Sequence, residues 1–380
     1  MQNKQRVHAA LEGKPVDRFP VAALYNFLVF DDRFSDLTGE PAWRRNIWKH
    51  GSPDEYIRYQ TQMTDVLPFE IVQPAIPPAR GWRERIEYVL KDGRPFRHDV
   101  IACTWEPIEE TTKSGHAFDD TANQTQYVFN RDDVNERVQA RSAETLVAEG
   151  VNDYIEATVS AYGDDAFVIS GGVEGMVYKC HHHVGLSNLY VMMLEQPDLL
   201  DYLISKQLEQ TVEHLRCLAA AGGDAIYIDD AMTTSDMISV GLYERFSLPA
   251  MTALVDEIHR LGHKAIVIYF GGVADRLDQI ASIGADGVLV ETSMKGYVND
   301  IGDCVDRIGD QTTLFGNIDP VGVIQDGSDE DLEAEIRRQL DAGRQGRGFI
   351  LSPASPLTPS TPLERIQRFI ELGKEIGSVT

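Results

Sequence analysis

Phe315-Gly-Asn-Ile-Asp-Pro320 and Gly348-Phe-Ile-Leu-Ser-Pro353 are the stretches that best define the fold of this 380-residue chain. Each is a short run of β-branched and aromatic residues that ends in residues typical of a turn. Such a pattern predicts a strand that stops where polar side chains begin. In α/β enzymes, strand ends of this kind carry the chemistry.

Six further apolar runs of similar length precede these two along the chain. They are nearly continuous in apolar residues, which is what a parallel sheet buried on both faces requires. The eight predicted strands are residues 19–25, 65–72, 166–170, 225–229, 265–270, 287–291, 313–316 and 348–352. Eight is the number of strands that closes a parallel α/β barrel.

Amphipathic stretches lie between several of these runs. Residues 197–221, 244–261 and 328–342 have helical periodicity, and Ser328 is a suitable N-cap for the last of them. Strands that alternate with helices predict a (β/α)8 TIM barrel, which we expect to form a single domain over residues 1–380.

Two departures from this alternation are predicted as additions to the barrel. Residues 4–11 predict a helix in an N-terminal extension that closes the floor or side of the barrel. An insertion at about residues 83–106 predicts a β-hairpin that turns at Asp92-Gly93. We expect the hairpin to form part of a lid over the mouth, the end of the barrel at which the strands finish.

The composition limits the partners of the chain. Its formal charge of −25 argues against nucleic acid and against an anionic membrane, which both require a positive protein surface. It has no apolar run of the ~18 residues that a membrane span needs, and its N-terminus is polar and lacks the features of an export signal. The four cysteines are far apart without CxxC spacing, which fits reduced thiols. We therefore expect a cytoplasmic protein; a homodimer is one assembly that we allow for.

A cluster of histidines, Cys180-His-His-His183, follows the third predicted strand. On a loop at the barrel mouth, His182 and His183 could bind a metal, or an imidazole could donate a proton. The alternative is a solvated or hydrogen-bonded cluster, because adjacent side chains diverge and a metal site needs ligands from more than one element.

Carboxylates and one tyrosine end several of the predicted strands. Asp229 and Asp230 point to opposite faces because they are successive strand residues, and we predict Asp230 at the mouth with Asp229 as hydrogen-bonded support. Tyr269, Glu291 and Glu70 hold similar positions on three other strands. We assign catalytic roles to Glu70, Asp230, Tyr269 and Glu291, with a structural cap as the alternative for Asp230.

Glu291 is a candidate for acid catalysis. It follows an apolar run and has no local partner before Lys295, so burial could raise its pKa into the range suited to a general acid. A salt bridge to Lys295 is the alternative.

Polar residues that follow the last two strands are candidates for substrate binding. These are Asn317, Asp319 and Ser355. Asn317 and Asp319 could instead tie their own loop through Asx turns. Ser352 and Ser355 could bond a ligand, but neither has an adjacent histidine base that would make it a nucleophile.

Four segments together resemble the uroporphyrinogen decarboxylase superfamily, and the resemblance extends over essentially the whole chain. They are the opening residues 6–20, Asp229-Asp-Ala-Met-Thr-Thr-Ser-Asp-Met-Ile-Ser239, Gly316-Asn-Ile-Asp-Pro320 and Thr361-Pro-Leu-Glu364. The fold that the resemblance implies is a barrel of the kind predicted above. The chain is more similar to the methyltransferase branch than to the decarboxylases themselves.

The decarboxylases carry an arginine-rich motif that binds the carboxylates of the porphyrinogen. The corresponding stretch here is Ala23-Leu-Tyr-Asn-Phe-Leu-Val29, which has no guanidinium to meet such a substrate. We assign Tyr25 and Asn26 of this stretch to the binding of a different substrate.

Another branch of the superfamily moves methyl groups between a corrinoid carrier and a thiol, with zinc held by a His-x-Cys pair and a distant Cys. The resemblance places these ligands at Ile268, Phe270 and Ser355. Zinc that activates a thiol needs soft or imidazole donors. We therefore do not expect that zinc site, although zinc held by other residues stays open.

The resemblance thus implies a methyltransferase that moves a methyl group from a small donor, such as a methyl ether or a methylamine, to a corrinoid. The corrinoid (cobalamin) would be bound to a partner protein, because the chain has no Asp-x-His-x-x-Gly cobalamin motif. Two alternatives remain open. One is a decarboxylase or other lyase that acts on a different substrate, and the other is a barrel that binds a ligand without catalysis.

Overall fold

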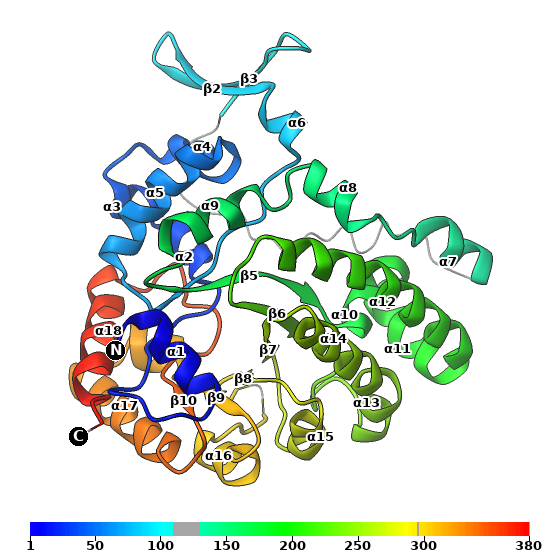
Figure 1. Ribbon diagram of the computed structural model, residues 1–380, viewed down its shortest axis with the longest axis vertical. Coiled ribbons are helices and arrows are strands. Elements are labelled where there is room, and N and C mark those ends of the chain that lie inside the picture. The colour runs from blue at the N-terminus through cyan, green and yellow to red at the C-terminus, as the bar shows by residue number, and fades with distance from the viewer. Residues whose placement is uncertain (109–129, 295, 380) are drawn as a thin grey trace.

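The main sheet of the protein is parallel and has seven strands in the order β1-β5-β6-β7-β8-β9-β10. The computed structural model describes residues 1–108, 130–294 and 296–379. Figure 1 shows the sheet curled, with helices around it. The strands are β1 (Ile71–Val72), β5 (Phe167–Glu174), β6 (Ala225–Asp230), β7 (Lys264–Tyr269), β8 (Gly287–Val290), β9 (Thr313–Phe315) and β10 (Phe349–Ile350). The predicted α/β barrel is confirmed.

The eighth position of the barrel is filled by residues 19–22, which we call the seam segment. Val21 forms a parallel bridge with Leu351, directly after β10. On the other side, the Glu70 N–H, directly before β1, donates to the Val21 carbonyl at 3.1 Å. Pro20 has no N–H to donate, so the segment forms single bridges where the sequence predicted a strand over residues 19–25.

The other predicted strands differ from the observed ones mainly in length. Residues 65–66 belong to a helix, and only Ile71 and Val72 of the second predicted strand pair with β5. The third predicted strand continues to Glu174 through an irregularity in register between Ile169 and Gly172. This extension places Glu174 on the strand, four residues beyond its predicted end at residue 170.

Helices occupy most of the chain between the strands. They are α1 (Asn3–Leu11), α2 (Asn26–Asp32), α3 (Phe34–Thr38), α4 (Arg45–His50), α5 (Pro53–Val66), α6 (Arg80–Arg83), α7 (Arg131–Arg137), α8 (Ala143–Ala148), α9 (Asp153–Tyr162), α10 (Met176–Val184), α11 (Leu186–Glu195), α12 (Pro197–Ala220), α13 (Val240–Phe246), α14 (Leu248–Arg260), α15 (Leu277–Ser282), α16 (Ile301–Ile308), α17 (Asp329–Gly343) and α18 (Leu363–Ile376), with short turns at η1 (Ala42–Arg44) and η3 (Pro320–Gln325). Ser328 caps α17 in a capping box with Asp331, as predicted. Within the described ranges, every helix is too short or too polar to cross a membrane.

The predicted hairpin is a three-stranded antiparallel sheet of β2 (Ile86–Lys91), β3 (Arg94–Asp99) and β4 (Thr104–Pro107). Asp92 and Gly93 both have positive φ, at 53° and 76°, which suits the tight turn predicted there. The sheet stands apart from the barrel, beyond α4 and α6 (Figure 1). Its role in a lid stays a prediction.

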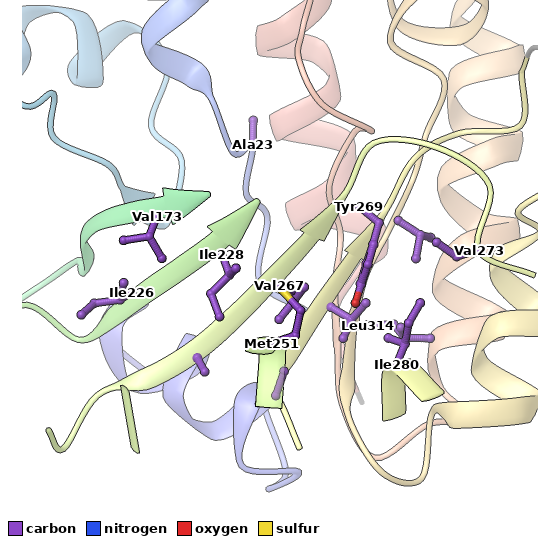
Figure 2. Packing of buried hydrophobic residues seen from close by; sticks show 14 of the residues in the cluster. Ala23, Val173, Ile226, Ile228, Met251, Val267, Tyr269, Val273, Ile280 and Leu314 are labelled. Atoms are coloured by element: carbon purple, nitrogen blue, oxygen red, sulfur yellow. The ribbon is translucent and has the colours of Figure 1, made fainter. Parts of the chain in front are cut away.

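Two apolar clusters lie on opposite faces of the parallel sheet. The helix-side cluster fills the space between the sheet and the outer helices, and Figure 2 shows part of it. The interior cluster fills the barrel with Val7, Ala10, Leu11, Ala22, Leu24, Ile71, Phe167, Ile169, Ala225, Ile266, Ile268, Leu289, Phe315 and Ile350. Because Val7, Ala10 and Leu11 come from α1, the N-terminal extension closes the barrel floor, as predicted.

A buried ion pair joins this extension to the first strand. Glu70 is fully buried, and its carboxylate accepts from Arg6 Nη1 at 2.9 Å and from Arg18 Nη1. Glu70 was predicted at the mouth, as the catalytic end of the second strand. That prediction is wrong, because the strand begins after it at Ile71, and Glu70 therefore lies at the floor.

Replacing Glu70 by Gln should lower the free energy of unfolding by about 3 kcal/mol, because it removes a charge on which buried Arg6 depends. Urea-induced unfolding would measure the change. Glu87→Gln, on the exposed hairpin, is the matched control and should change stability by less than about 0.5 kcal/mol. Equal stability of the two variants would show that the floor ion pair contributes little.

Candidate active site

The alternation of side chains along β6 decides which residues face the barrel interior. Ala225 belongs to the interior cluster and Tyr227 packs against it, so Asp229 points the same way. Ile226 and Ile228 belong to the helix-side cluster (Figure 2). Asp229 therefore faces the interior at the mouth end of β6.

A second carboxylate lies beside Asp229 on the neighbouring strand. Glu174 ends β5 and is paired in register with Asp229 of β6. Gly172 faces the interior, since a Cβ there would overlap the Tyr227 ring, and Glu174, two residues on, shares that face. We call Glu174 and Asp229 the carboxylate pair.

Aromatic rings enclose the Asp229 end of this pair. Tyr25 Oη donates a hydrogen bond to Asp229 Oδ1, and the Tyr25 ring centroid lies 5.6 Å from that of Tyr227 and 5.5 Å from that of Phe270. Tyr25 has a left-handed backbone with φ of 60°, and its N–H donates to Gln73 Oε1 at 3.0 Å. A non-glycine residue held in this conformation is a feature often found at functional sites.

The two carboxyl groups have opposite protonation tendencies. Burial raises the pKa of Asp229 to about 7, the charges of Glu174 and Asp230 add to the rise, and the Tyr25 hydrogen bond opposes it. Burial also acts to raise the pKa of Glu174, but the hydrogen bond and charge of His182 outweigh it, so that pKa falls below its ordinary value. Neighbouring carboxyls that differ in this way suit one proton donor and one ionised partner.

Asp230, which the sequence placed at the mouth, faces the helices. It is 1% exposed and accepts from the backbone N–H groups of Met232 and Thr233 at 3.2 and 3.1 Å and from Ser247 Oγ at 3.2 Å. It therefore caps the loop after β6, which was the alternative considered. The predicted positions of Asp229 and Asp230 are reversed.

Tyr269 is likewise turned away from the mouth. Its side chain lies in the helix-side cluster (Figure 2), where its hydroxyl is 2.9 Å from that of Tyr243. Its catalytic assignment is wrong, because the interior-facing residues of this strand are Ile266 and Ile268.

Glu291 follows β8 on the same face as Leu289, which belongs to the interior cluster. It is 7% exposed, and its carboxylate accepts from the Thr292 N–H at 2.9 Å. Lys295, the alternative partner considered above, lies outside the described residues. A role for Glu291 in acid catalysis stays a prediction.

The predicted substrate-binding residues near the last strands bind backbone. Asn317 Nδ2 donates to the carbonyls of Glu291 and Asn299 at 3.2 and 2.7 Å. Asp319 caps the turn η3, because its carboxylate accepts hydrogen bonds from the N–H groups of Val321 and Gly322. Asn26, beside Tyr25, is buried, and its Oδ1 has no hydrogen-bond partner in the part of the chain described.

The histidine cluster lies in the last turn of helix α10, and the predicted mouth loop is therefore wrong. His182 Nε2 is 3.0 Å from both carboxylate oxygens of Glu174. His183 Nε2 is 2.6 Å from Gln207 Nε2 on α12, so the two predicted metal ligands face different partners. Across residues 1–108, 130–294 and 296–379, no three His, Cys, Asp or Glu side chains lie close enough together to hold a metal.

Comparison with known protein families gives a match over more than half of the chain. The sequence profile described as Uroporphyrinogen decarboxylase (URO-D) matches residues 117–376. The chain belongs to the uroporphyrinogen decarboxylase family.

Some relatives match about half of this chain, and others match nearly all of it at lower sequence identity. Uroporphyrinogen decarboxylases of Tolumonas auensis and Coxiella burnetii are 31% and 28% identical, over 49% and 58% of this chain and 50% and 60% of their own length. The methylcobamide:CoM methyltransferase MtaA of Methanosarcina barkeri is 24% identical over 97% of this chain and 96% of its own. A methyltransferase from Methanosarcina mazei shares the fold, with a TM-score of 0.71 at 19% identity and 99% coverage of both chains. The resemblance to the methyltransferase branch is thereby confirmed.

The zinc ligands of the thiol-methylating branch have no counterpart in this member of the family. Ile268 belongs to the interior cluster, and Phe270 packs against that cluster and against Tyr25. Ser355 Oγ donates to the Leu24 carbonyl at 3.5 Å. Ile268 in β7 and Phe270 directly after it face the interior, but their side chains carry no donor atom, so these residues do not fit that zinc site.

Sequence reasoning missed Glu174 and Tyr227 and undervalued Asp229. Ala225, Tyr227 and Asp229 are alternate residues and therefore share one face of β6. Because both faces of the strand are apolar over most of its length, the sequence does not show which of them is the interior face. Glu174 was hidden by the irregularity at Gly171 and Gly172, which resembles a turn in sequence.

The raised pKa of Asp229 predicts a pH-dependent contribution to stability. With a folded pKa of about 7 and an unfolded pKa of about 4, the folded protein binds the extra proton between these values, so this contribution is complete below about pH 4 and is lost as the pH rises to 7. The stability of the protein relative to the Asp229→Asn variant should fall by at most about 4 kcal/mol over that range. Urea unfolding at pH 4, 5.5 and 7 would measure it; a constant difference would refute the shift.

Proposed function

We propose that this protein is a methyltransferase that moves a methyl group from a small donor to a corrinoid bound to a separate protein. The observation that carries the proposal is the carboxylate pair at the barrel mouth, with Asp229 protonated near neutral pH beside ionised Glu174. The similarity to a methyltransferase over 97% of the chain supports the same conclusion.

The chemistry needs an acid if the donor is a methyl ether. As the carbon–oxygen bond breaks, its electron pair stays on the oxygen, and Asp229 supplies the proton that makes this oxygen a neutral leaving group. The methyl carbon is taken by the cobalt(I) corrinoid, whose electron pair forms the new bond. The leaving group of a methylammonium donor is already a neutral amine and needs no proton. Of the two donors, a protonated Asp229 therefore favours the methyl ether.

The surroundings of Asp229 suit this role. The Tyr25 ring, whose hydroxyl binds the carboxyl, packs against Tyr227 and Phe270, and partial burial beside these rings favours the protonated form. Tyr25 Oη holds the carboxyl in one orientation. A substrate rich in carboxylates would meet ionised Glu174 at the same place, which argues against a tetrapyrrole acid.

The partners and location follow from the same proposal. A corrinoid-binding protein would deliver the acceptor to the mouth, and the donor would be a small methyl ether. We place the enzyme in the cytoplasm, where reduced corrinoid proteins and free thiols persist, and retain the homodimer as a proposal. Nothing in the described residues supports a zinc-dependent route.

Asp229→Asn should lower methyl transfer from methoxyaromatic donors to added cob(I)alamin by about 100-fold or more, because asparagine cannot donate the proton. Initial rates with a panel of methoxyaromatics and methylamines would measure it. In the unmodified enzyme the rate should decline above about pH 7, as Asp229 loses its proton.

Tyr269→Phe is the control, since that hydroxyl faces Tyr243 on the helix side, and it should retain near-normal rates. Full activity of Asp229→Asn would show that Asp229 is not the proton donor. Turnover of carboxylic acids to carbon dioxide, without methyl transfer, would identify a lyase.

A further inference from the structure

A role for Asp229 as an acid creates a requirement of its own. An acid that gives up a proton in each cycle must regain one, and the hydrogen-bond partner of Asp229 is Tyr25 Oη. Burial raises the pKa of Tyr25 well above its ordinary value, so this hydroxyl keeps its proton. The replacement proton must therefore come from another direction.

Glu174 offers that direction. Its Cα is the register partner of that of Asp229 across β5 and β6, and both side chains face the barrel interior. The Glu174 side chain is 32% exposed, and the His182 side chain, with Nε2 3.0 Å from both carboxylate oxygens, is 50% exposed. His182 is therefore the more exposed of the two side chains, and it is the one that meets solvent before Glu174.

The other ionisable groups near the pair are less suited to this task. Lys179 Nζ donates to Thr211 Oγ1 at 3.0 Å, toward α12, and His181 Nδ1 lies 2.6 Å from the Tyr178 carbonyl. Burial raises the pKa values of Tyr178 and Tyr227, and both hydroxyls stay protonated. Asp230 faces the helices, where Met232, Thr233 and Ser247 already donate to it.

We propose that His182 and Glu174 form a proton relay that returns a proton from solvent to Asp229 after each methyl transfer. The proton passes from water to the His182 ring, from Nε2 to the Glu174 carboxylate, and from that carboxyl to ionised Asp229. No electrons are transferred, and water is the source of the proton. The role in turnover rests on the proposed function, whereas the relay itself can be tested without any donor.

The first test measures proton exchange at Asp229 directly. Relaxation-dispersion NMR on the ¹³C-labelled Asp229 carboxyl at pH 7 gives the rate at which this group gains and loses its proton. His182→Gln should slow that exchange at least about tenfold, and added imidazole should restore it. His183→Gln, which alters the neighbouring ring that faces Gln207, should exchange at the normal rate. Equal exchange rates in His182→Gln and the unmodified protein would overturn the relay.

The second test separates the chemical step from the recovery step, with 2-methoxyphenol as donor and cob(I)alamin as acceptor. His182→Gln should transfer the first methyl group at the normal rate, because Asp229 starts protonated, and should then turn over at least about tenfold more slowly. An equal loss in both phases would assign His182 to the chemical step and overturn the relay. Failure of the proposed function would show differently: the unmodified enzyme would transfer no methyl group, while His182→Gln would still slow proton exchange at Asp229.

Discussion

The two-residue alternation of side chains along the parallel strands is the constraint on which the rest of the structure depends. In β6 it sends Ala225, Tyr227 and Asp229 into the barrel, and Ile226, Ile228 and Asp230 toward the helices. A shift by one residue would place Asp230 at the mouth and turn Asp229 toward the helices. Both the packing of the helices and the position of Asp229 therefore depend on the same backbone register.

The same constraint explains how much could be predicted from the sequence. The strands could be predicted because each strand of a parallel sheet that is buried on both faces is a nearly continuous apolar run in the sequence. Those runs conceal which residue faces which side, so the choice between Asp229 and Asp230 could not be made from β6 alone. The wrong placement of Glu70 and the omission of Glu174 have a related cause. The ends of a strand are set by its pairing with a neighbouring strand, and the local sequence does not mark them. The capping box at Ser328 and the Asp92-Gly93 turn were predictable because their physics lies within a few residues.

Burial acts differently on similar side chains in this barrel. Glu70, at the floor, is buried against two arginines that neutralise it, whereas Asp229, at the mouth, is buried against rings and another carboxylate. The first arrangement stabilises a charge and joins the N-terminal extension to the barrel. The second disfavours the charge and leaves a proton available. The function of each carboxyl is thus decided by its neighbours more than by its depth.

The seam segment gives the barrel one side that is less firmly bonded than the others. The other neighbouring strands of the sheet share at least two register pairs, whereas residues 19–22 are held by one bridge to Leu351 and one hydrogen bond from the Glu70 N–H. Tyr25, which orients Asp229, follows this segment by three residues. Local opening of a protein begins where backbone hydrogen bonds are fewest. We therefore expect any local opening of the barrel to begin at this seam and to move Tyr25, while the paired strands that carry Glu174 and Asp229 stay closed.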